Sequence, residues 1–303
     1  MLRQTATVIS AWLILGLAAG AGGQPANPNL NRLVAAERAF SSMSEAKGLR
    51  EAFLFYLADD SIVFRPKPVP GKKSYEEMPA SSAALLTWGP EYAEVSAGGD
   101  IGYTTGPYVV RDRARPGESV AHGHYVSVWE RQANREWKVS LDAGVRHPQS
   151  GPAPESVATL PAGYKRWRGR RVDRDSERAA LLKEESRFAQ TARAEGLTEA
   201  YIIHAADDVR VYRDGELPVT GKTAFLKLVA GSTPKYDWGP VDAVVSSTGD
   251  IGYVFGVREG MSMDSQELFE SSSYLRIWRK LSGGEWRIVL DLAVPIPTAN
   301  GSD

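Results

Sequence analysis

The chain repeats itself, and this repeat limits the folds that it can adopt. Short motifs of the first half return in the same order about 150 positions later. The recurring motifs are Ala-Asp-Asp (58–60 and 206–208), Trp-Gly-Pro (88–90 and 238–240), Gly-Asp-Ile-Gly-Tyr (99–103 and 249–253) and Leu-Asp (141–142 and 290–291). Self-similarity at a fixed, domain-sized period indicates two copies of one folding unit.

The motifs place the two domains at residues 25–147 and 175–297, with a short tail at 298–303. Residues 148–174 between them are rich in proline and then in arginine and lysine, a composition typical of a semi-extended linker. We expect the basic residues of this linker to be solvated or to hold the two domains together. An interaction with another protein is the alternative.

The first 24 residues have the pattern of a signal peptide. Arg3 supplies a positive charge, residues 8–19 are mostly apolar, and small residues stand at 19–21. This arrangement predicts export, with the mature protein in the periplasm or secreted. The apolar run is shorter than a membrane-spanning helix requires, so we expect no stable membrane anchor after cleavage.

Composition excludes several classes of protein. The 36 basic and 37 acidic residues leave a formal net charge of -1, which argues against a nucleic-acid partner. The chain has no cysteine, so disulfides, thiolate chemistry and a lipid-modified cysteine are excluded. No phosphate-binding glycine loop, nucleophile elbow or zinc signature occurs, and the sequence predicts neither a cofactor nor a metal site.

Each copy changes its periodicity along the chain. Apolar residues at helical spacing near 30–43 and 49–57 are followed by period-two segments near 61–65, 92–97, 101–111, 122–131 and 136–145. Helices followed by a strand meander predict an α+β fold in which the helices cover one face of a sheet.

These motifs resemble the nuclear transport factor 2-like superfamily, and within it the SnoaL-like domains of unknown function found in exported bacterial proteins. The resemblance covers both halves. It implies two tandem cone-shaped domains, each with N-terminal helices packed on a strongly curved antiparallel sheet around a cavity. It also implies intramolecular pairing through the convex sheet faces, and we expect this pairing to bury Tyr125, Trp129, Tyr274 and Trp278.

The resemblance further suggests which side chains enter each cavity. Ser140 and Asp142 on the last strand are expected to face it, as is Asp291 in the second copy. The same register turns His122, His124, Val126 and Val128 inward, with Ser271 and Ser273 at the places of the two histidines. The remaining expected ligand-binding residues are Arg65, Trp88, Tyr108, Arg213, Trp238 and Arg258.

Two functions remain open. The first is binding of a small apolar or anionic molecule, with Arg65 or Arg213 suited to an anionic group. The alternative is an enzyme of the cyclase, dehydratase or isomerase kind, with His122 or His124 as base and Asp142 as its partner. A ketosteroid isomerase is disfavoured, because Arg65 and Arg213 stand where those enzymes place a carboxylate. Asp142 and Asp291 also have a structural alternative, which is pairing with Arg65 or Arg213.

Overall fold

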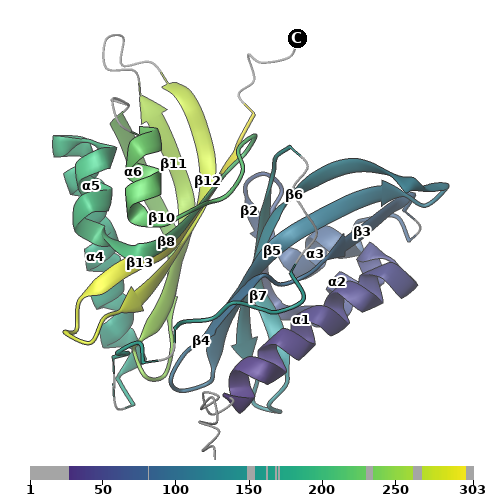
Figure 1. The fold of residues 1–303 in the computed structure, drawn as a ribbon, viewed down its shortest axis with the longest axis horizontal. Coiled ribbons are helices and arrows are strands. Elements are labelled where there is room, and N and C mark those ends of the chain that lie inside the picture. Colours follow the sequence, from purple (N-terminus) through teal and green to yellow (C-terminus); the bar gives the residue numbers. More distant parts are fainter. Residues whose placement is uncertain are drawn as a thin grey trace, which may run out of the picture.

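The computed structural model describes residues 27–80, 82–148, 154–161, 163–167, 169, 171–229, 235–261 and 268–297. The predicted signal peptide and the tail lie outside these residues. Figure 1 shows two domains, each built from helices on the outside and a sheet on the inside. None of the helices in the described ranges is long and apolar enough to cross a membrane.

The first domain begins with two helices and ends with a sheet. Asn27 caps the first helix, because its side chain accepts hydrogen bonds from the amides of Asn29 and Leu30. The elements are α1 (Pro28–Lys47), α2 (Leu49–Tyr56), β1 (Leu57–Phe64), β2 (Pro68–Pro70), α3 (Gly71–Glu76), β3 (Ala84–Trp88), β4 (Tyr92–Val95), β5 (Ile101–Asp112), β6 (Arg115–Arg131) and β7 (Trp137–Arg146).

The second domain repeats this order. Asp173 caps its first helix by accepting a hydrogen bond from the amide of Ser176. The elements are α4 (Arg174–Glu195), α5 (Leu197–His204), β8 (Ala205–Arg213), β9 (Val219–Thr220), α6 (Lys222–Val229), β10 (Lys235–Val245), β11 (Ile251–Met261), β12 (Leu268–Lys280) and β13 (Trp286–Pro295).

The two sheets have the same topology. Their strand orders are β2-β1-β7-β6-β5-β3, with β4 also paired to β5, and β10-β11-β12-β13-β8-β9. The long strands pair antiparallel, whereas β1 with β7 and β8 with β13 are parallel. The predicted α+β fold of two tandem domains is therefore confirmed, and each sheet is mixed instead of purely antiparallel.

The repeated Gly-Asp-Ile-Gly-Tyr motif has a packing reason. A Cβ atom on Gly102 would lie 2.6 Å from a methyl group of Leu33 on α1, and one on Gly252 would lie 2.6 Å from a methyl group of Leu181 on α4. Such distances are too short for carbon atoms in contact. Glycine therefore lets the first helix of each domain pack closely on its sheet.

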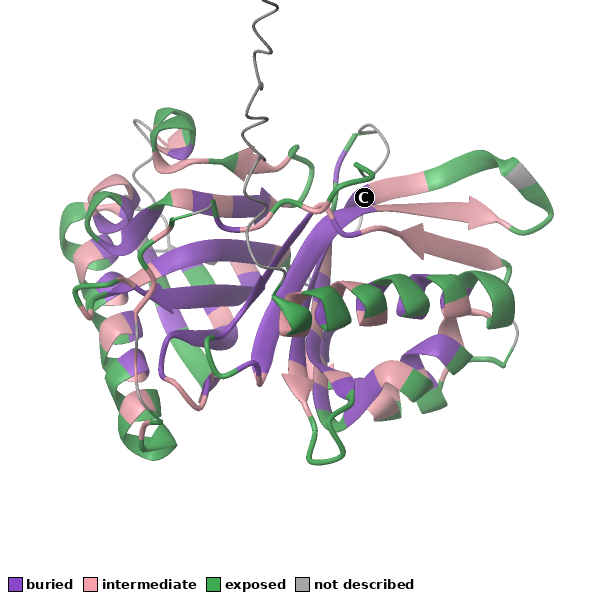
Figure 2. Cartoon of the chain, turned by 60° about the horizontal axis from the view of Figure 1, so that its bottom comes forward, coloured by how far each residue is buried: buried purple, intermediate pink, exposed green. Residues whose placement is uncertain are grey.

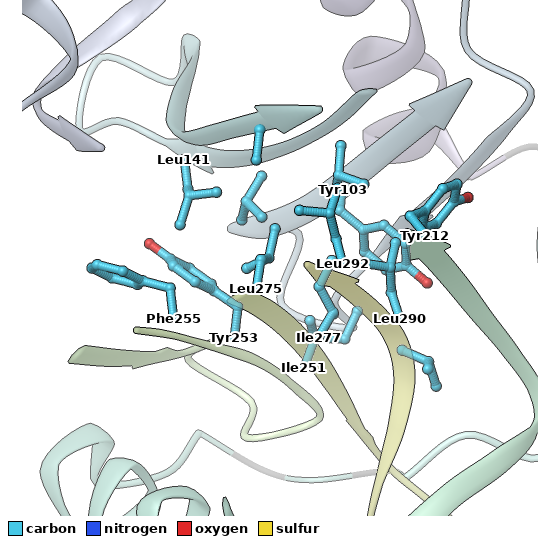
Figure 3. Packing of buried hydrophobic residues seen from close by; sticks show 14 of the residues in the cluster. Tyr103, Leu141, Tyr212, Ile251, Tyr253, Phe255, Leu275, Ile277, Leu290 and Leu292 are labelled. Carbon is cyan, nitrogen blue, oxygen red and sulfur yellow. The ribbon is translucent and has the colours of Figure 1, made fainter. Parts of the chain in front are cut away.

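The outer faces of the two sheets pack against each other. Strands of both domains contribute buried side chains to one continuous cluster, in which Leu141 and Tyr103 meet Leu275, Ile277 and others of the second domain (Figure 3). Figure 2 shows the facing strands as buried and the outer helices as largely exposed. Each sheet is consequently covered on both faces, by its own helices and by the other sheet.

Two equivalent turns exchange hydrogen bonds across this contact. The carboxylate of Asp250 accepts from the amide of Ala97 at 2.7 Å, and that of Asp100 accepts from the amide of Ser247 at 2.8 Å. Ala97 and Ser247 hold the same place in the repeat, as do the two aspartates. Reciprocal contacts between equivalent residues are the sign of a two-fold relationship.

The charges between the sheets break this symmetry. Arg279 is almost fully buried and donates to Glu94 of the first domain at 3.0 Å and to Asp208 at 2.6 Å. Glu130 stands at the position of Arg279 in the first copy, and its carboxylate instead accepts from the Tyr253 hydroxyl at 2.9 Å. The contact thus joins two different surfaces.

The predicted linker lies against both domains. The amide of Ala93 donates to the carbonyl of Ala158, and the guanidinium of Arg166 donates to the carbonyl of Val95 at 2.7 Å. Near the second domain, the amide of Val172 donates to the carbonyl of Ser247 at 3.0 Å. At least one of the basic linker residues is therefore used inside the molecule.

The four aromatic residues expected between the sheets lie elsewhere. Trp129 belongs to the core beneath the helices of the first domain, and Tyr274 and Trp278 belong to the corresponding core of the second. Tyr125 lines the cavity described below. The strands therefore carry the opposite register from the one expected, with Val126 and Val128 between the sheets.

Candidate functional site

The first domain encloses a cavity of about 950 Å³ between its helices and the inner face of its sheet. Most of the lining is apolar or aromatic, as is usual in sites for small organic molecules. Polar groups come from Arg65, Tyr75, Tyr108, Asp142 and Arg146. The apolar part of this wall includes Leu49, Phe53, Phe64, Met78, Leu86, Trp88, Val110 and Tyr125.

Packing between helix and strand holds Arg65 at the cavity. Its guanidinium donates to the hydroxyl of Tyr75 and, at 3.3 Å, to the carbonyl of Phe64. The ring of Tyr75 stacks on that of Phe53, with centroids 4.2 Å apart. Arg65 itself is exposed and forms no ion pair with any residue in the described ranges. Its charge is therefore accessible to a ligand.

Asp142 lies deeper, where β7 passes along the cavity. The hydroxyl of Ser127 donates to its carboxylate at 2.8 Å. Burial raises the pKa of Asp142 to about 6, although Ser127 and the charge of Arg65 act to lower it. The carboxyl group is therefore partly protonated near neutral pH and is able to give or take a proton.

Glu37 is a second buried carboxyl group, on α1 behind the cavity wall. It accepts hydrogen bonds from the indole N–H groups of Trp88, at 2.5 Å, and Trp129, at 2.8 Å, and from the hydroxyl of Thr104. Burial nevertheless raises its pKa to about 7. Nearby, the hydroxyl of Tyr125 is buried without a hydrogen-bond partner in the described chain.

In the second domain, a buried arginine neutralises the two equivalent carboxyl groups, Asp291 and Glu185. Arg276 is fully buried, donates to Asp291 at 2.6 Å and is paired with Glu185. The second copy's arginine at the Arg65 position, Arg213, also pairs with Asp291, at 2.8 Å. Although burial acts to raise it, these two guanidinium groups hold the pKa of Asp291 well below its usual range.

The second domain's own cavity is smaller, about 510 Å³, and both of its arginines are already paired. Arg258 is bonded to Glu270 at 2.8 Å, and Glu270 also accepts from Ser272 at 2.6 Å. Arg213 reaches this cavity as well, but it is held by Asp291. Of the two cavities, that of the first domain offers more space and freer polar groups.

The structure brings together six of the expected site residues. Arg65, Trp88, Tyr108 and Asp142 line the first cavity, and Arg213 and Arg258 line the second. Trp238 instead packs edge-to-face on Phe188, with ring centroids 5.4 Å apart, and Asp291 is fully enclosed by its ion pairs. Neither residue lines a cavity.

The two histidines do not face the cavity, which corrects the expected placement. His124 lies between the domains, where its Nδ1 is 2.6 Å from Nε2 of His147 and its Nε2 is 3.3 Å from Glu91. It lines a separate, more open depression. His122 is partly exposed and bonded to Ser119 at 2.9 Å. Neither is positioned to act with Asp142 as a catalytic pair.

The positions predicted for Ser140, Ser271 and Ser273 were also wrong, because none of them lines its cavity. Ser140 is bonded to the hydroxyl of Tyr253 in the other domain, and Ser273 donates to the carbonyl of Pro66 at 2.7 Å. Ser271 is absent from the residues that line either cavity and accepts the amide of Ile296 at its carbonyl.

A β-bulge in β7 explains why Asp142 lines the cavity as expected whereas Ser140 does not. Trp129 pairs with Val139, but Val128 pairs with Leu141, so that Ser140 is the extra residue. The bulge places Ser140 and Leu141 on the same side, toward the other domain, while Val139 and Asp142 face the inside of the first domain. On β6, both faces are buried, and hydrophobic alternation does not distinguish them.

Sequence reasoning missed Phe53, Tyr75, Tyr125 and Arg146 in the cavity wall. Asp214 of the second domain was missed as well. Phe53 and Tyr75 lie on helices, and the spacing of apolar residues on a helix marks its buried face without showing which members adjoin a cavity. In the described residues, no group of three or more histidine, aspartate and glutamate side chains is arranged to hold a metal ion.

Several solved structures are similar to parts of the chain. A nuclear transport factor 2-like protein of unknown function from Pseudomonas putida is 15% identical, covers 43% of this chain and 93% of its own, and has a TM-score of 0.35. A ketosteroid isomerase-like protein from Erwinia carotovora is 16% identical, with coverages of 41% and 99% and a TM-score of 0.36.

A third, a nuclear transport factor 2-like protein with a cystatin-like fold from Novosphingobium aromaticivorans, is 20% identical, with coverages of 42% and 84% and a TM-score of 0.31. Each match spans about the length of one domain. Such distant similarities say nothing about activity. No protein-family model matches the chain, and no curated protein matches its sequence.

Proposed function

We propose that this protein binds a small, mainly apolar molecule in the cavity of its first domain, and that Arg65 and Tyr125 donate hydrogen bonds to an oxygen of that molecule. The size of the cavity, about 950 Å³, and its largely apolar lining fit a ligand of this kind. The export pattern of residues 1–24 supports a role outside the cytoplasm.

The observations that carry the proposal are a guanidinium group without an ion pair and a buried hydroxyl group without a hydrogen-bond partner. Arg213 is neutralised by Asp291 at 2.8 Å in the second domain, whereas Arg65 has no ion pair within the described residues. The hydroxyl of Tyr125 is buried and unpaired. A buried polar group without a partner is costly, so a ligand oxygen that accepts from Tyr125 removes this cost on binding.

A fluorescence titration with 8-anilinonaphthalene-1-sulfonate, an apolar anion, tests the proposal. We expect Tyr125→Phe to weaken binding by about three- to tenfold, the effect of one lost hydrogen bond. Tyr274→Phe is the matched control, because Tyr274 is the equivalent residue, is also buried and unpaired, and lines neither cavity. Leu86→Trp, which enlarges a side chain on the cavity wall that packs against the inner core of the first domain, is expected to abolish binding.

Equal effects of the two tyrosine variants would contradict the assignment of the site. Binding that survives Leu86→Trp in a protein with a native circular dichroism spectrum would show that the probe binds elsewhere.

Asp142 favours a second candidate function, proton transfer on a bound substrate. Its carboxyl group lines the cavity and has a pKa of about 6, which suits a general acid or base near neutral pH. This form of the enzyme hypothesis uses no histidine. Exchange of the α-protons of 2-tetralone in D2O, followed by NMR, is expected to be faster with the wild type than with Asp142→Asn. Identical rates would exclude it.

A further inference from the structure

The cavity of the first domain is not built by that domain alone. Asp214, Val294, Pro295 and Pro297 of the second domain form part of its wall, and Asp214 and Pro295 line the second cavity as well. The second cavity, in contrast, is lined only by residues of its own domain among those described. The two cavities are therefore unequal in a way that the repeat does not require.

Hydrogen bonds fix the Asp214 loop against the cavity. One carboxylate oxygen of Asp214 accepts from the amide of Arg146 at 2.9 Å, and the amide of Gly215 donates to the carbonyl of Arg146 at 2.7 Å. Gly215 has a φ of 81°, a conformation that glycine adopts without strain. Arg146 ends β7, the strand that carries Asp142 into the cavity.

The equivalent arrangement on the other side is chemically impossible. Pro295 occupies the position of Arg146 in the second copy, and proline has no amide hydrogen to donate. In the first copy, Pro66 stands at the place of Asp214. The loop that closes the first cavity therefore has no counterpart at the second.

We propose that a ligand in the first cavity also contacts the second domain, and that Asp214 selects ligands whose outer end carries a hydrogen-bond donor such as an ammonium group. This inference rests on the proposed binding function. The second carboxylate oxygen of Asp214 makes no hydrogen bond to any described residue, and it belongs to an exposed side chain at the cavity wall. The apolar strip of Val294, Pro295 and Pro297 covers the body of the same ligand.

The recognised molecule thus has an acceptor oxygen, an apolar body and a donor at its outer end. The order follows from the fold, because Tyr125 is buried on a central strand and Asp214 is exposed on a loop of the neighbouring domain. A carboxylate with an unbonded oxygen favours a hydrogen-bond donor over an acceptor at this end of the ligand.

Two matched probes test this inference on the full-length protein. Dansylcadaverine carries an aliphatic chain that ends in an ammonium group, and N-hexyl dansylamide carries an uncharged chain of similar length. We expect the wild type to bind dansylcadaverine more tightly. Asp214→Asn keeps the oxygen that accepts from Arg146 and removes the charge, and it is expected to weaken dansylcadaverine binding about three- to fivefold. Binding of the hexyl probe is expected to stay unchanged.

Glu216→Gln is the matched control for loss of a negative charge, because Glu216 lies on the same loop but lines only the second cavity. We expect this variant to bind both probes as the wild type does. Equal effects of the two variants, or an unchanged preference in Asp214→Asn, would overturn the role of Asp214 and leave the proposed function standing. If neither probe binds the wild type, the proposed function fails and this inference fails with it.

Discussion

Ser127 and Arg276 occupy the same position in the two domains, and each pairs across its sheet with the aspartate of the last strand, Asp142 or Asp291. Ser127 donates one hydrogen bond to Asp142 at 2.8 Å. Arg276 binds both Asp291 and Glu185. A single difference in side chain therefore leaves two carboxyl groups without a buried cation in the first domain and neutralises both in the second.

Removal of this cation is expected to destabilise the second domain. Arg276→Met leaves the buried Glu185 without a cation and Asp291 with Arg213 as its only cation, at a cost of about 3–5 kcal/mol in the free energy of unfolding. Urea denaturation measures the change. Arg187→Met is the control, because Arg187 forms a surface pair with Glu184 and we expect a loss of at most about 1 kcal/mol. Equal losses would show that the buried cluster has no special role.

Stability is expected to depend on pH through Glu37 and Asp142. Their pKa values rise from ordinary values of 4.5 and 3.8 to about 7 and about 6 on folding. Between the ordinary pKa and the raised pKa of each group, the folded state binds more protons than the unfolded state. The free energy of unfolding therefore falls as the pH rises through this range. We expect the protein to be more stable at pH 5 than at pH 8, by about 4 kcal/mol.

Asp142→Asn serves as the control for this effect, because an amide does not titrate and the difference between pH 5 and pH 8 is expected to shrink. Urea midpoints at the two pH values provide the measurement. Asp291 has a lowered pKa, so its stabilising contribution is lost only at pH values below the ordinary carboxyl range. A wild-type midpoint that increases from pH 5 to pH 8 would contradict the assignment.

Gly123 keeps the wall of the first cavity in place. A Cβ atom there would lie 2.0 Å from the carbonyl oxygen of Val145 and 2.4 Å from the ring of Tyr108. Gly123→Ala is therefore expected to lower stability by about 1–3 kcal/mol and to weaken ligand binding, because Tyr108 must move. Gly117→Ala has nothing within 4 Å and is expected to change neither. Thermal unfolding and probe titration distinguish the two variants.

The domains are expected to stay together when the linker is cut. A protease site placed at residues 149–153 separates the chain into two fragments without touching the cluster between the sheets. We expect the fragments to co-elute in size-exclusion chromatography. Arg279→Met leaves Glu94 buried without its cation and is expected to promote dissociation. Fragments that elute separately in the unmodified sequence would show that the linker alone joins them.

The repeated motifs predicted the fold well because they mark places where backbone geometry is constrained. Gly102 and Gly252 allow the close approach of a helix, and Asp100 and Asp250 bond to the opposite domain. The directions of the strand residues were harder to predict. His124 and Tyr125 both lie on a strand buried on both faces, and the bulge at Ser140 changes the side on which later residues lie.

The sequence shows that serine and arginine stand at this equivalent position, but it does not show which carboxyl groups the arginine neutralises. It depends on Glu185, which is distant in the chain and reaches Arg276 only because α4 packs on β12's inner face. Asp214 was missed for a similar reason. Its contact with Arg146 joins two domains, and neither pattern nor spacing within one domain indicates it.

The reciprocal bonds of Asp100 and Asp250 describe the geometry of a symmetric dimer held in one polypeptide. In a dimer of identical subunits, every substitution appears twice, and a buried arginine would enter both cavities at once. With two gene segments fused, Arg276 and Asp214 each arise in one copy alone. One half is then free to fill its interior with a buried cluster of ion pairs, while the other keeps the larger cavity.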